Sequence, residues 1–231
     1  IPAEQTLDWR NPPVATLTLI LINCLIFFAY QSEDDKRYVE AASYYVNSGL
    51  LNSEAPLYLD FIEENHGSGE RLNLIAYVEE YSLNALSHIV VNDIEFSAHL
   101  KALGQQPNGN YIWSEERDTF TQLQRSLSYF AYGFIPAEFS LQGFFGNMFL
   151  HGSLDHLLGN MLFLFICGFA LEIAFGRVWY VSLYLLSGCL STGFSYLTNM
   201  GGYIPGVGAS GAISGLMGMY VALYSMRQIQ F

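Results

Sequence analysis

Long apolar runs alternate with polar stretches along this chain. Residues 14–30 read VATLTLILINCLIFFAY, which at about 1.5 Å per helical residue is long enough to cross a bilayer. Two more apolar runs occupy residues 154–175 and 178–197, and a fourth, rich in glycine, begins near Ser210 and continues to about residue 224. The pattern predicts four membrane-spanning helices.

The polar stretch 31–131 holds no apolar run long enough to span a membrane. Two sets of apolar residues within it recur at helical spacing, namely Leu72, Ile75 and Val78, and Leu86, Ile89 and Val90. Glycines at 66–69 and 104–109 predict loops. We therefore expect a small, mainly helical soluble insert between the first and second spans.

Two shorter segments complete the outline. Residues 134–150 are aromatic and interrupted by glycine, which is typical of a segment lying in the membrane interface. Residues 199–205 predict a loop. The expected fold class is all-α: a polytopic membrane helical bundle, with four spans present of six, and a soluble insert. Its expected parts are a cytoplasmic leader (1–13), the first transmembrane helix (14–30), the insert (31–131) and a truncated membrane core (132–231).

Composition agrees with a membrane protein, because 52% of the residues are hydrophobic and only 13% are charged. The net charge of −12 is concentrated in residues 31–140, which hold 17 of the 21 acidic residues and 6 of the 9 basic ones. Nucleic acid is therefore excluded as a partner. The acidic side chains are interpreted as a solvated face, with a protein partner or a cation as the alternative. Cys24, Cys167 and Cys189 lie in apolar runs, which argues against a disulfide framework.

Basic residues near the predicted spans indicate the orientation. Arg10, Arg177 and Arg227 all fall on one side of four alternating spans, and the positive-inside rule makes that side cytoplasmic. The insert and Ser210 are then extracytoplasmic. We expect a multi-pass protein of the plasma (inner) membrane.

Ser210 lies near the start of the fourth predicted span, in the run GVGASGAISGLMG. Glycines before a serine permit an uncommon backbone path, and a serine at a helix start lies near free N–H groups that stabilise an oxyanion. The alternative is structural: Gly211, Gly215 and Gly218 are small residues that let membrane helices pack closely.

The second predicted span opens with HGSLDHLLGN, residues 151–160. His156 and Asn160 are four apart and share a helix face, and both carry hydrogen-bond donors that are costly in a membrane unless they are used. His151 is expected at or just before the helix start. The spacing of these histidines, with Asp155 pointing elsewhere, does not suit a zinc pair, so no metal site is predicted. The structural alternative is a polar pair that joins two helices.

Five stretches in order resemble the rhomboid family of intramembrane serine proteases. They are NPPVATL at 11–17, YGFIPAEF at 132–139, MFLHGSLDHLLGN at 148–160, GFALEIAFG at 168–176 and GASG at 208–211. The resemblance covers the first span and residues 132–227.

The resemblance implies roles for individual residues. Ser210 matches the nucleophile of the family's Gly-x-Ser-Gly motif, here Gly208 to Gly211. His156 and Asn160 match the side chains of the oxyanion site.

The resemblance implies that three other positions do not take part directly in the reaction. Glu172 matches a structural glutamate. His151 matches a histidine near the mouth of the active site that is not the general base. Ser214 is expected to be a packing residue.

The sequence departs from the family pattern in three ways. The large insert is unusual, and Gln142 and Gly143 replace a common Trp-Arg pair. The family's general base is a histidine on the sixth helix, but no histidine follows Ser210 here. The remaining histidines, His66, His88 and His99, lie in the insert.

The expected activity is that of a serine endopeptidase. It would cleave transmembrane protein substrates near the outer membrane face through an acyl-enzyme on Ser210, without metal or organic cofactor. The alternatives are an inactive rhomboid-like protein that binds membrane clients, and an adaptor whose insert recruits partners. We expect the natural product to continue through two more spans that supply the histidine, and the 231 residues alone not to cleave.

Overall fold

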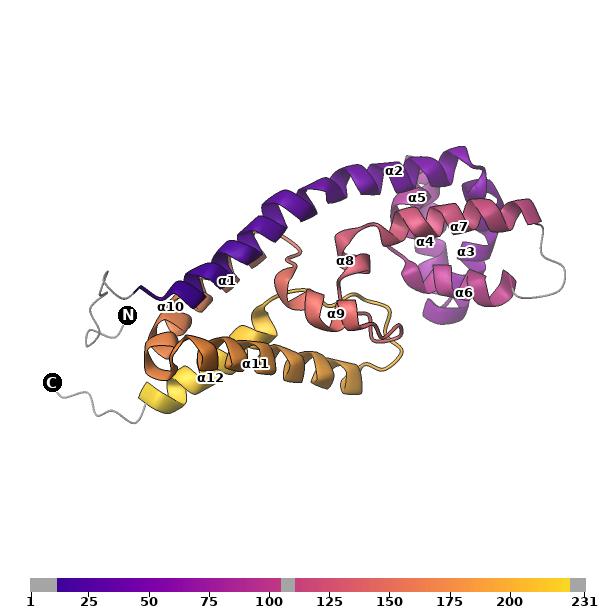
Figure 1. Ribbon diagram of the computed structural model, residues 1–231. Coiled ribbons are helices and arrows are strands. Elements are labelled where there is room, and N and C mark those ends of the chain that lie inside the picture. The colour runs from indigo at the N-terminus through magenta and orange to yellow at the C-terminus, as the bar shows by residue number, and fades with distance from the viewer. Residues whose placement is uncertain (1–11, 105–110, 225–231) are drawn as a thin grey trace. The chain divides into compact units, whose positions relative to one another are not determined.

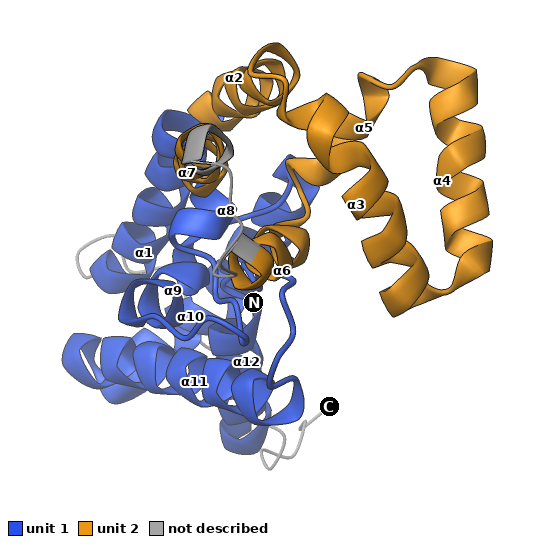
Figure 2. Ribbon diagram, turned by 90° about the vertical axis from the view of Figure 1, so that its right-hand side faces the viewer, with its two compact units in different colours: residues 1–32, 128–231 blue, residues 33–127 orange. Residues whose placement is uncertain are grey.

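The computed structural model describes residues 12–104 and 111–224. These residues form helices joined by turns, and the β-type pairing found among them is an isolated antiparallel bridge between Phe134 and Gly206. The chain separates into two compact units, shown in blue and orange in Figure 2: residues 1–32 with 128–231, and residues 33–127. The predicted all-α fold class is confirmed for the described residues.

The first unit contains the apolar helices. Its elements are α1 (Val14–Leu25), the π-helical turn η1 (Ile26–Tyr30), α8 (Ser128–Ala131), α9 (Leu141–Gly146), η3 (Asn147–Phe149), α10 (Leu154–Phe175), α11 (Arg177–Thr198) and α12 (Ser210–Tyr224), with the short 3₁₀ turn η2 (Gln31–Glu33) at the boundary between the units. Residues 154–175 and 178–197 thus form one helix each, as the apolar runs predict. The predicted loop 199–205 is also present, and it continues to α12.

Local sequence explains where α10 begins and ends. The hydroxyl of Ser153, whose backbone is extended, accepts a hydrogen bond of 3.2 Å from the His156 N–H and so caps the helix start. Gly176 ends the helix with φ +77°, a conformation that side-chain-bearing residues rarely adopt. Because α11 starts at the next residue, one glycine separates the two helices.

The core of the first unit lies where α12 packs against α10 and α11, and where α1 packs against α10 (Figure 1). Leu164, Tyr180, Tyr184 and Leu216 are fully buried there. On other faces of α10 and α11, more than half of the surface of Leu158, Leu162, Leu190 and Phe194 is exposed. Apolar side chains that face outward on apolar helices are suited to contact with lipid.

Two helical stretches, Val14–Asn47 and Leu154–Phe175, are long and apolar enough to cross a membrane. α11 also has 22 residues but contains several serines and threonines, and it does not meet the same test. α12 has 15 residues and is about 22 Å long, which is shorter than the ~30 Å hydrocarbon core. Four spans therefore remain a prediction.

The second unit is a helical bundle. Its helices are α2 (Asp34–Asn47), α3 (Leu50–His66), α4 (Ser68–Tyr81), α5 (Ala85–Val90), α6 (Ile94–Gly104) and α7 (Tyr111–Arg125). The loop predicted at 66–69 is reduced to Gly67, whose φ of +89° lets the chain turn between α3 and α4 within one residue. Residues 105–109 of the other predicted loop lie outside the described residues.

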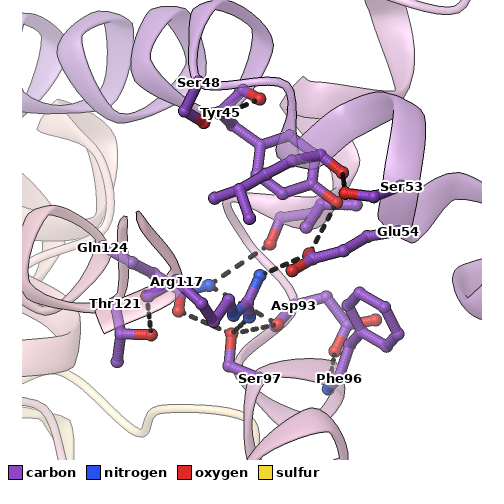
Figure 3. A network of polar contacts seen from close by, with 12 residues as sticks. Tyr45, Ser48, Ser53, Glu54, Asp93, Phe96, Ser97, Arg117, Thr121 and Gln124 are labelled. Atoms are coloured by element: carbon purple, nitrogen blue, oxygen red, sulfur yellow. Dashed lines mark hydrogen bonds and ion pairs between the residues drawn. The ribbon is translucent and has the colours of Figure 1, made fainter. Parts of the chain in front are cut away.

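A buried polar network joins α2, α3, α6 and α7 in the second unit (Figure 3). Arg117 donates to Glu54 at 2.7 Å and to Ser97 at 2.5 Å, and Tyr45 donates to Glu54 at 3.0 Å. Glu54 is completely buried, and burial raises the pKa of its carboxyl. The sequence pattern predicts a solvated face for the acidic residues of the insert, and this prediction is wrong for Glu54, which is buried beside Arg117.

Candidate active site

Ser210 is the first residue of α12, and its side chain is exposed. The first hydrogen bond of the helix runs from the Ile213 N–H to the Ala209 carbonyl at 3.0 Å. The N–H groups of Ser210 and the next two residues therefore have no carbonyl in a preceding turn. Together with the helix dipole, such N–H groups favour negative charge beside the serine hydroxyl.

The imidazole of His156 lies against Gly208, two residues before the serine. A Cβ atom added at Gly208 would come within 2.7 Å of His156 Cε1 and 2.9 Å of its Nε2, and within 3.6 Å of Ser210 Oγ. The structure thus brings His156 and Ser210 together around one glycine. Gly208 also has φ +129°, so both its backbone and its surroundings require a residue without a side chain.

The loop before Ser210 is held by two sets of backbone hydrogen bonds. Phe134 and Gly206 exchange N–H to carbonyl bonds of 2.9 and 2.8 Å. The Gly208 N–H donates to the Asn147 carbonyl at 2.8 Å. Residues 132–150, which precede α10 in sequence, therefore fix the loop that leads into the serine.

Asn147 is a site residue that the sequence analysis missed. Its side-chain amide donates to the Gly143 and Phe144 carbonyls at 2.8 and 2.7 Å, and it lies 3.3 Å from the Thr192 hydroxyl on α11. A lone asparagine within the apolar run GFFGNMFL was the available signal, because a polar side chain in such a setting must find partners. Asn147 thus connects residues 132–150, α11 and the loop before Ser210.

Asn160 follows His156 by one turn of α10, as predicted. Its side chain is 8% exposed, and its Nδ2 has no hydrogen-bond partner among the described residues. A buried amide donor without a partner costs about 1–3 kcal/mol. Such a cost is compatible with a donor kept for a ligand or a reaction intermediate.

His151 lies in the loop before α10, and its side chain is 1% exposed. Its ring packs edge to face on His156, with ring centroids 5.2 Å apart. Neither ring nitrogen has a hydrogen-bond partner in the described part of the chain. Burial, and then the neighbouring His156, lower the pKa of His151 to about 4. The Phe149 carbonyl opposes this shift without reaching hydrogen-bond geometry.

Glu172, near the end of α10, caps the start of α1. Its carboxylate accepts from the Ala15 and Thr16 N–H groups at 2.9 and 2.7 Å and from the Thr16 hydroxyl at 2.8 Å. Arg177 lies 3.6 Å from the same carboxylate. A carboxylate at a helix start satisfies otherwise unpaired donors and interacts favourably with the dipole. This geometry gives Glu172 a structural task.

The glycines of α12 differ in their surroundings. A Cβ added at Gly211 would come within 2.6 Å of Ser191 Cβ, and one added at Gly215 within 2.5 Å of Ser187 Cβ. Both glycines therefore permit the close approach of α11, as the structural alternative expected. Gly218 has no such neighbour within 4 Å. Ser214 is exposed rather than packed within the described chain.

A cavity of about 210 Å³ adjoins the serine. Ser191, Thr192 and Ser195 of α11 line it together with Gly208 and Ser210. The hydroxyl groups on its wall make it more polar than the surrounding helix faces. The lining of the cavity thus includes hydroxyl groups of α11 and of Ser210.

Known proteins resemble this chain over the part that carries the site. The family model of the rhomboid domain matches residues 138–231, which include Ser210, His156 and Asn160. RHOMBOID-like protein 5 of Arabidopsis thaliana is 44% identical over 69 residues, which is 30% of this chain and 22% of that protein. The putative rhomboid protease YdcA of Bacillus subtilis (strain 168) is 37% identical over 78 residues, or 34% and 39% of the two chains.

RHOMBOID-like protein 1 of Arabidopsis thaliana is 43% identical over 74 residues, or 32% of this chain and 18% of that protein. The chain thus spans well under half the length of these curated relatives. No solved structure matches it. The domain match and the three relatives agree with the geometry around Ser210, and they show that residues 138–231 are similar to the rhomboid domain.

Proposed function

We propose that this chain carries the nucleophile and oxyanion donors of an intramembrane serine endopeptidase. The observation that carries the proposal is the packing of His156 against Gly208, beside the Ser210 hydroxyl and the start of α12. A nucleophile and preorganised donors at one point are what acyl transfer requires. The substrates are transmembrane proteins, cleaved near the outer membrane face.

In the proposed reaction, Ser210 Oγ attacks the scissile carbonyl and its proton passes to a general base. The resemblance assigns that role to a histidine of the family's sixth helix. The negative charge on the carbonyl oxygen is stabilised by the His156 and Asn160 side chains and by the N–H groups at the start of α12. The C–N bond then breaks, the amine leaves with a proton from the base, and water hydrolyses the Ser210 ester.

The topology belongs to the same proposal. Arg10, Arg177 and Arg227 favour a cytoplasmic leader, with the second unit and Ser210 on the outer side of the plasma membrane. A cysteine placed at an exposed position of the second unit, such as Glu79→Cys, should react with a membrane-impermeant thiol reagent in intact cells. Reaction only after lysis would reverse the orientation.

The activity is tested in the natural gene product that contains these residues, expressed with a transmembrane reporter substrate. Ser210→Ala should abolish cleavage and labelling by a fluorophosphonate probe. Ser214→Ala, the next serine on the same helix, should retain both. Equal cleavage by the Ser210→Ala protein would remove Ser210 from the mechanism. A parent protein that retains the reporter without cutting it would instead support the inactive, client-binding alternative.

A further inference from the structure

Gln31, at the end of the first apolar helix, binds the backbone of His151. Its Oε1 accepts from the His151 N–H at 3.0 Å, and its Nε2 donates to the His151 carbonyl at 2.9 Å. The same Nε2 lies 3.4 Å from the Ser128 hydroxyl. All three residues belong to the first unit, and 120 positions separate Gln31 from His151 in sequence.

Gln31 supplies hydrogen-bond partners for the N–H and the carbonyl of His151, which have none within a helix. His151 lies between η3 and α10, so its N–H and carbonyl cannot join a helix ladder. A primary amide offers one acceptor and one donor in the same plane, and it pairs with a residue's N–H and carbonyl as a neighbouring strand would. Glutamate has no donor for the carbonyl, and leucine has neither group.

The His151 ring, carried by this fixed backbone, packs against the ring of His156. The ring is 1% exposed and its nitrogens have no hydrogen-bond partner in the described chain, so it contributes shape rather than hydrogen bonds. It packs edge to face on the His156 ring, with 67° between the ring planes, and Cε1 and Nε2 of His156 lie against Gly208. The His156 imidazole therefore contacts both the His151 ring and the loop that leads into Ser210.

We propose that Gln31 is a positioning residue: by holding the His151 backbone, it keeps the His151 ring against His156 and the His156 imidazole beside Ser210. This inference rests on the proposed function, in which His156 donates to the oxyanion. A displacement of about 1 Å in such a group can lower a rate by about 10²-fold. Because the oxyanion forms only during the reaction, the loss should appear in kcat rather than in KM.

The test compares Gln31→Leu, Gln31→Glu and the control Gln122→Leu, which makes the same change at an exposed site on α7. In the natural gene product, Gln31→Leu should lower kcat by roughly 10²-fold with KM changed less than about twofold. Gln31→Glu should lower it comparably, since its carboxylate faces the His151 carbonyl. The Gln122→Leu protein should match the parent.

A second pair of variants separates packing from hydrogen bonding at His151. His151→Phe preserves a flat ring and should keep kcat within a few-fold of the parent. His151→Ala leaves a void beside His156 and should lose about as much as Gln31→Leu. If Phe and Ala are equally damaging, the ring acts through its nitrogens and the positioning account is wrong.

An activity-independent readout completes the experiment. Diethylpyrocarbonate modification of His151, followed by mass spectrometry, should be slow in the parent and at least about tenfold faster in Gln31→Leu, because the loop loses both bonds that hold it. Unchanged modification together with unchanged kcat overturns the inference. If the proposed function itself is wrong, Ser210→Ala has no effect on cleavage. The rate of His151 modification still shows whether Gln31 holds the His151 backbone.

Discussion

The His156 imidazole occupies the space that a side chain at Gly208 would need. The ideal Cβ position at Gly208 lies 2.7 Å from His156 Cε1, closer than real Cβ contacts allow. The same position lies 3.6 Å from Ser210 Oγ. One glycine therefore sets how closely the proposed donor approaches the proposed nucleophile.

Gly208→Ala should lower cleavage by about 10²-fold or more, because the new methyl group displaces His156 and the backbone at φ +129° becomes strained. Gly218→Ala is the matched control, since a Cβ there meets nothing within 4 Å. The control should cleave normally and be slightly more stable, by up to about 1 kcal/mol. Normal turnover by Gly208→Ala, at matched expression, would show that the close contact is not needed.

Removing each proposed oxyanion donor should distinguish a role of His156 and Asn160 in the reaction from a role in helix packing. His156→Ala should reduce kcat by about 10²–10³, the scale for one such donor. Asn160→Ala should cost less, because the remaining donors compensate in part. Reporter cleavage and thermal unfolding are measured together. A large loss of stability with near-normal kcat for the folded fraction would return both residues to the structural alternative.

Glu172→Gln should destabilise the first unit by about 1–3 kcal/mol, because an NH₂ group then faces N–H donors at the start of α1. Glu79→Gln alters an exposed carboxylate on α4 and should change stability by less than about 0.5 kcal/mol. Unfolding midpoints in detergent micelles give the comparison. Equal midpoints for the two variants would show that the cap does not stabilise the fold.

His151 should make the protein less stable in acid. Its pKa is about 4 in the folded chain against an ordinary 6.5, so the unfolded chain binds the proton more readily. This group therefore contributes stability above pH 6.5 that is lost as the pH falls toward 4. His151→Phe should flatten that part of the stability profile. Parallel profiles for parent and variant, measured by thermal unfolding between pH 7 and 4, would contradict the assignment.

The buried Glu54–Arg117 pair predicts that a single substitution destabilises the second unit more than a double substitution does. Arg117→Met leaves Glu54 charged and buried, and should destabilise this unit by about 3–5 kcal/mol. Adding Glu54→Leu should recover much of that loss, since no unpaired charge remains. Lys101→Met, at an exposed site, is the control. Hydrogen exchange in α3 and α7 gives the measurement, and no recovery in the double variant would mean that packing, not charge, is responsible.

The sequence by itself determined the long apolar helices of the first unit and the proposed nucleophile. The length of an apolar run is a local property, so residues 154–175 could be assigned to a helix before any fold was known. The spacing of His156 and Asn160 placed them on one helix face for the same reason. Ser210 was identified by its neighbouring glycines, which act on the backbone immediately around it.

Only the tertiary structure decided which distant groups meet. Gln31 binds His151, which is 120 positions away in sequence, and Asn147 binds the loop before Ser210. No periodicity or motif around Gln31 or Asn147 identifies these partners. The buried Glu54–Arg117 pair looked like surface charge for the same reason. Hydrogen-bond partners of irregular backbone and buried polar groups are set by which segments pack together, and that information is absent from local sequence.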